Sequence, residues 1–156
     1  MEPWLTGSEP HSHPILRAVF HSFEQVREDA RRFTSGATAT AAVTFQLRHM
    51  AGSVQRLTAY ACGESLTEAQ IAAVAREDET GASLDELLDG LDTALTASEA
   101  RLRTIDLTDL AAPRFVGRAK LPTTLGGLLV HLAEHTQRHL GELIVHARAA
   151  RPADKE

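Results

Sequence analysis

Residues 128–146 read LLVHLAEHTQRHLGELIVH, a stretch that combines an apolar helical pattern with four histidines. His131, His135 and His139 recur every four residues, so on an α-helix they lie one turn apart on one face. On a helical wheel these three and His146 fall within about 80° of one another, and Glu142 falls inside that arc. An apolar stripe borders the arc and consists of Leu125, Leu132, Leu143 and Ala147. The stretch therefore predicts a half-buried helix with imidazoles along one edge.

Two imidazoles one helical turn apart can reach a single metal ion. A His-x-x-x-His pair is also common by chance, and a surface pair needs no metal. Two histidines are too few for a closed or catalytic site, so a metal centre here requires a third ligand from elsewhere in the chain. The His-Glu-x-x-His pattern of zinc proteases is absent, because Thr136 follows His135.

Length and composition limit the class of protein. The 156 residues suit one domain, 1–156, and aromatic residues make up only 4% of them. The single cysteine, Cys62, excludes an internal disulfide and a cysteine-based zinc site. A net charge of −5 argues against a nucleic-acid partner. No apolar run reaches bilayer length and no signal peptide is apparent, so we expect a cytoplasmic protein without a membrane partner.

Apolar residues recur at helical spacing in four long segments, which predicts helices near residues 13–34, 41–62, 83–104 and 123–149. Capping-box patterns at 67–70 and 83–86 predict a short helix from 67 to about 76 and the start of the third long helix. Residues 105–122 contain Pro113, Gly117 and Pro122, and we expect them to be extended or irregular. The fold class is therefore all-α, a four-helix bundle with a long crossover between its second and third helices.

The segment 41–62 carries two lines of residues at helical spacing. The main line is apolar, and His49 lies about 120° from its centre, in a second line with Phe45 and Tyr60. Either this helix buries two faces, or His49 lies on the surface or at a subunit interface. The second line and the few aromatic residues favour a homodimer. On the first helix, His21 lies off the apolar stripe, so we expect it to be solvated.

Two separated motifs together resemble the DinB-like/YfiT-like superfamily of metal-dependent enzymes. They are LRHMAGS at 47–53 and HTQRHLGE at 135–142, and the similarity extends over essentially the whole chain. The resemblance implies up-down-down-up topology and a metal site formed by His49, His135 and His139. Two positions differ from the usual pattern: Glu142 stands where glutamine is frequent, and His131 adds an imidazole one turn before the pair.

The resemblance also implies a class of function. Activities in the family include transfers and isomerisations that use low-molecular-weight thiols. We therefore expect a divalent metal ion (zinc, nickel or iron), a small-molecule substrate that can be such a thiol, and transferase or hydrolase chemistry. Glu142, inside the histidine arc, is the candidate catalytic base or a partner of a metal ligand; a solvated helix carboxylate is the plainer alternative. The competing function is a non-catalytic, stress-associated helical dimer in which the metal is structural.

Overall fold

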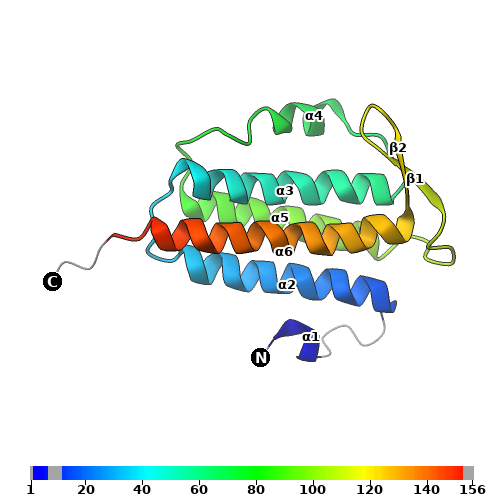
Figure 1. The fold of residues 1–156 in the computed structure, drawn as a ribbon, viewed down its shortest axis with the longest axis horizontal. Coiled ribbons are helices and arrows are strands. Elements are labelled where there is room, and N and C mark those ends of the chain that lie inside the picture. Colours follow the sequence, from blue (N-terminus) through cyan, green and yellow to red (C-terminus); the bar gives the residue numbers. More distant parts are fainter. Residues whose placement is uncertain (1, 7–11, 153–156) are drawn as a thin grey trace.

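The computed structural model describes residues 2–6 and 12–152, and it is mostly helical. Four long helices lie side by side in Figure 1: α2 (Pro14–Thr34), α3 (Ala41–Ala61), α5 (Leu84–Leu102) and α6 (Leu125–Ala149). Two short helices accompany them, α1 (Pro3–Thr6) and α4 (Glu68–Val74). The predicted helical segments are confirmed to within a few residues at each end. No helix within the described ranges is long and apolar enough to cross a membrane.

Side chains at the helix starts explain the boundaries. Ser83 and Glu86 form the predicted capping box of α5, and Thr67 and Gln70 form that of α4. In each box the hydroxyl accepts from a backbone N–H of the first turn, and the later side chain accepts from the cap residue's own N–H. At the start of α6 the Thr124 hydroxyl accepts from Gly127 N at 3.1 Å. Backbone donors that would otherwise lack partners are thereby satisfied at three helix starts.

Residues 105–122 contain one feature that the sequence reading missed, an antiparallel hairpin. Strand β1 (Pro113–Val116) pairs with β2 (Leu121–Thr124), and Pro113 lies opposite Thr124. The helix expected from 123 or 124 accordingly starts at Leu125, after the strand has ended. Within residues 2–6 and 12–152 the sheet has two strands, so each strand is an edge, where proline is tolerated because one side of the strand has no hydrogen bonds to make.

The core forms where the apolar stripes of the long helices meet. Its largest fully buried side chains come from all four long helices and include Phe23, Leu47, Leu91 and Leu129. Burying side chains of this size contributes roughly 1.5–3 kcal/mol each, so this core is the main source of stability. Helix α6 packs against both α2 and α3, which places its histidine-bearing edge beside α3.

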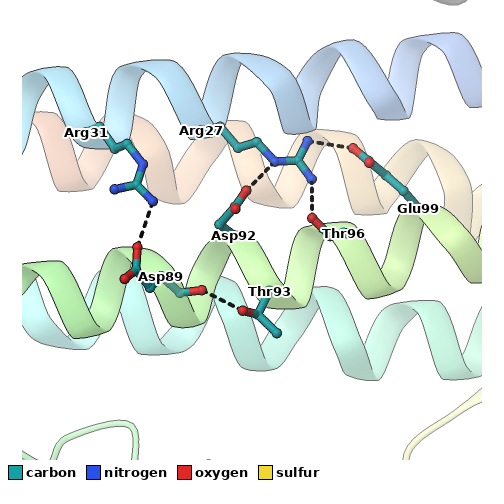
Figure 2. Close-up of polar contacts among 7 residues, drawn as sticks. All are labelled: Arg27, Arg31, Asp89, Asp92, Thr93, Thr96 and Glu99. Carbon is teal, nitrogen blue, oxygen red and sulfur yellow. Dashed lines mark hydrogen bonds and ion pairs between the residues drawn. The ribbon is translucent and has the colours of Figure 1, made fainter.

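Polar contacts join α2 to α5 along the outside of the core (Figure 2). The Arg27 guanidinium donates to Asp92 Oδ1 and to Glu99 Oε1, both at 2.7 Å, and to Thr96 Oγ1 at 3.2 Å. Arg31 makes a further ion pair with Asp89 at 2.9 Å. The guanidinium of Arg27 is planar and carries several N–H donors, so this one side chain can bind three residues of α5 and fix its position relative to α2.

The expectation that His21 is solvated is wrong, because only 7% of its surface is exposed. It lines a small cavity that also contacts Trp4 of the N-terminal segment and Ala133 of α6. Periodicity along α2 alone could not reveal this burial, because it does not show that α1 and α6 pack against α2.

Candidate metal centre

Three histidines meet between α3 and α6. His49 comes from α3, while His135 and His139 are one turn apart on α6. One nitrogen from each ring lies within 4.8 Å of the other two, close enough for all three to hold one metal ion. The Nε2 atoms of His49 and His135 are 3.2 Å apart. The ring centre of His139 is 4.3 Å from that of His49 and 4.5 Å from that of His135.

The second face of α3, which carries Phe45 and His49, makes contacts within the same chain. The Phe45 ring stacks on the His49 imidazole, with ring centres 5.4 Å apart and planes 14° from parallel. The His49 side chain is 20% exposed. It is therefore a half-buried residue that faces α6, and the off-stripe position on the wheel reflects a helix with two packed faces.

A carboxylate from the segment after α4 contacts the outer nitrogen of His49. Glu77 follows α4, and its side chain is only 9% exposed. Its Oε2 lies 2.7 Å from His49 Nδ1, and its Oε1 forms an ion pair with Arg56 Nη1 at 2.8 Å. A carboxylate that accepts the Nδ1 proton leaves the Nε2 lone pair of His49 free to bind a metal ion.

The side-chain amide of Gln46 accepts a hydrogen bond from the outer nitrogen of His139, as Glu77 does for His49. Gln46 Oε1 accepts from His139 Nδ1 at 2.8 Å, and Gln46 Nε2 donates to Glu142 Oε2 at 2.7 Å. Glu142 Oε2 is also 3.4 Å from His139 Nδ1. Glu142 therefore lies on the outer side of the His139 ring, away from Nε2. Gln46 was missed from the sequence, although its position three residues before His49 places it near the same face of α3.

The two α6 histidines are held in the neutral form that binds metal. Burial, together with the neighbouring imidazoles of His139 and His49, lowers the pKa of His135 to about 4. Burial and His49 also lower the pKa of His139, despite the opposing effect of Glu142. Both rings are therefore neutral at pH 7, as a metal ligand must be.

The hydrogen-bond pattern fits a cation between the rings. His49 Nε2 and His135 Nε2 face each other at 3.2 Å, so without a shared proton or a cation their lone pairs would repel. His135 Nδ1 is buried and has no hydrogen-bond partner among the described residues. Three neutral imidazoles form a ligand set that suits zinc, nickel, iron(II) or cobalt.

His131 is not part of this group of three. Its Nδ1 lies 3.2 Å from Glu134 Oε2, and its side chain is 45% exposed. Its ring centre is 5.3 Å from that of His135. The extra imidazole thus lies beside the cluster and pairs with a carboxylate on its own helix.

Gly52 makes room for the ion pair that supports His49. A Cβ at this position would lie 2.7 Å from Arg56 Nη1 and 3.0 Å from Glu77 Oε1. We expect Gly52→Ala to displace these side-chain ends and to lower metal affinity severalfold, up to about tenfold. The same change should alter thermal stability little, because the preference for alanine over glycine in a helix, about 1 kcal/mol, opposes the cost of displacing this part-buried ion pair.

Chelator competition and thermal unfolding would measure the two effects of Gly52→Ala separately. Gly90→Ala is the matched control, because a Cβ at Gly90 of α5 would have no atom within 4 Å. It should gain helix stability without losing metal affinity. Equal metal affinities in the two variants would contradict the role assigned to Gly52.

Comparison with known proteins places this site in a family. The profile of the DinB superfamily matches residues 40–143, which run from the start of α3 into α6 and include all three histidines. Searches of curated proteins and of solved structures find no match to the chain.

Proposed function

Because the chain belongs to the DinB superfamily, we propose that it is a metal-dependent enzyme that acts on small molecules by thiol transfer or hydrolysis. The proposal includes the up-down-down-up form of the four-helix bundle. Its support is the chain direction in Figure 1, where α2 and α6 run one way and α3 and α5 run the other. The long connection through α4 makes this order feasible, because it returns the chain to the end where α3 begins.

The observation that carries the proposal is the grouping of His49, His135 and His139 around one point. Glu77 and Gln46 hold the outer nitrogens of His49 and His139. Such outer partners fix the tautomer and orientation of a ligand before the ion arrives. A chance group of histidines has no need of this support.

A divalent ion at this site would supply positive charge that lowers the pKa of a bound water or thiol. The residues of the chain orient the ligand rings, and burial keeps His135 and His139 neutral by lowering their pKa values. We assign the Glu142 carboxylate to holding Gln46, and through it His139. The alternative role of Glu142 as a general base requires its side chain, 46% exposed, to turn toward the Nε2 side of the ring.

The runner-up function is a non-catalytic protein with a structural metal. It requires four protein ligands, since structural zinc sites are closed. The cluster contains three histidines among the described residues, while His131 pairs with Glu134 and Glu142 pairs with Gln46. Three ligands leave a position for water or substrate, and this favours the enzyme.

The test begins with metal analysis of protein purified without an affinity tag, followed by a screen of thiol conjugation and ester or amide hydrolysis. The metal-dependent enzyme predicts about one ion per chain and turnover that chelation abolishes and metal restores. One ion per chain without an exchangeable water, together with unfolding on chelation and no turnover, would instead support the structural metal.

A further inference from the structure

A second potential binding site lies at the end of the bundle beside the hairpin. A cavity of about 990 Å³ opens between the C-terminal end of α3, helix α4 and the β1–β2 hairpin. In Figure 1 these three elements meet at one end of the molecule, with α4 outside α3. The volume is at the upper end of the roughly 300–1,000 Å³ range of small-molecule pockets. None of the three clustered histidines lines this cavity.

The walls of the cavity are apolar and unusually exposed. Ile71 and Val74 of α4 are 40% and 47% exposed, and Phe115 of β1 is 54% exposed. All seven residues of α4 are exposed or half-exposed. A helix that buries so little of its apolar surface in the chain itself has surface available for a ligand.

The hairpin turn adds unpaired positive charge to this apolar surface. Arg118 and Lys120 line the cavity, and neither has a side-chain partner among the described residues. A backbone hydrogen bond closes the turn from which both side chains extend: Lys120 N donates to Gly117 O at 3.1 Å. Both residues lie in a protein whose net charge is −5.

The other charged groups at the cavity already have partners. The Glu64 carboxylate pairs with Arg101 at 2.6 Å. The Arg114 guanidinium donates to Ala61 O at 2.8 Å and to Pro113 O at 3.0 Å. The charge that remains available at the cavity is therefore positive and belongs to Arg118 and Lys120.

We propose that this cavity binds a small amphipathic anion, whose apolar body contacts Ile71, Val74 and Phe115 and whose acidic group pairs with Arg118 and Lys120. A hollow of this volume suits an aryl or medium-chain alkyl carboxylate, and charge complementarity selects the anion over a neutral analogue. The proposal does not depend on the metal centre.

The experiment titrates the full-length protein with decanoate and with decanol, each in competition with the fluorescent anion 8-anilinonaphthalene-1-sulfonate. We expect one decanoate per chain, binding at least about tenfold more tightly than decanol, on the scale of one lost hydrogen bond to a charged group. The double variant Arg118→Glu, Lys120→Glu should weaken decanoate binding at least tenfold and bring it to or below the level of decanol, because two negative charges replace two positive ones. Val74→Glu should weaken both ligands.

Arg32→Glu is the control for charge reversal, because it makes one such arginine-to-glutamate change near the end of α2, which ends at the opposite end of the bundle from the hairpin in Figure 1. It should bind decanoate as the unchanged protein does. Circular dichroism of each variant checks that it is folded, and a chelator in the buffer should change nothing. Equal binding of decanoate and decanol, or undiminished decanoate binding in the folded double variant, would overturn the proposal.

Discussion

Single replacement of His49, His135 or His139 by alanine should lower the affinity for a divalent metal ion by more than about a hundredfold. That loss exceeds the 10–100-fold typical of an outer partner, because each change removes one of three ligands and leaves two. The three ring nitrogens lie within 4.8 Å of one another, so each can supply one bond to the same ion. Elemental analysis and chelator competition on tag-free protein would measure the loss.

His131→Ala is the control for these ligand variants. His131 lies on the same edge of α6, but it pairs with Glu134 and is not part of the group of three. The variant should retain most of the metal. Full occupancy in His49→Ala together with loss in His131→Ala would show that the ligand assignment is wrong.

Glu77→Gln should lower metal affinity about 10–100-fold while leaving all three ligands in place. Glutamine keeps the size of the side chain but removes the negative charge beside His49 Nδ1. It also removes the ion-pair partner of Arg56, whose side chain is only 14% exposed. A part-buried cation without its partner destabilises the fold, so the midpoint of thermal unfolding should fall as well.

Glu79→Gln is the matched control for Glu77→Gln, because it neutralises an exposed carboxylate two residues away. It should change neither metal affinity nor stability measurably. If both variants bind metal as the unchanged protein does, then Glu77 does not support His49. Titration with a chromophoric chelator resolves effects of this size.

The second line on α3 was the sequence argument for a homodimer. Phe45 and His49 of that line contact each other, and His49 faces α6 and Glu77 of the same chain. Tyr60, further along the line, lines the cavity beside the hairpin. The dimer stays a prediction, and sedimentation at micromolar protein would test it.

The sequence alone determined the positions of the helices and the pairing of two of the three candidate ligands. Apolar periodicity and two capping boxes placed the long helices to within a few residues, because these signals act between residues three or four apart. The same local geometry paired His135 with His139, since a helix fixes the distance between residues one turn apart. The choice of His49 came from family resemblance, because its position on the wheel left surface and buried alternatives open.

Only the tertiary structure decided how distant segments meet around the histidines. Glu77 belongs to a stretch with the composition of a solvated loop, and it reaches His49 only because the chain after α4 folds back over α3. His21 likewise is buried although it lies off the apolar stripe of α2, a helix against which both α1 and α6 pack. Periodicity describes one helix at a time, whereas burial and coordination depend on which segments pack together, and that information lies in contacts between residues far apart in sequence.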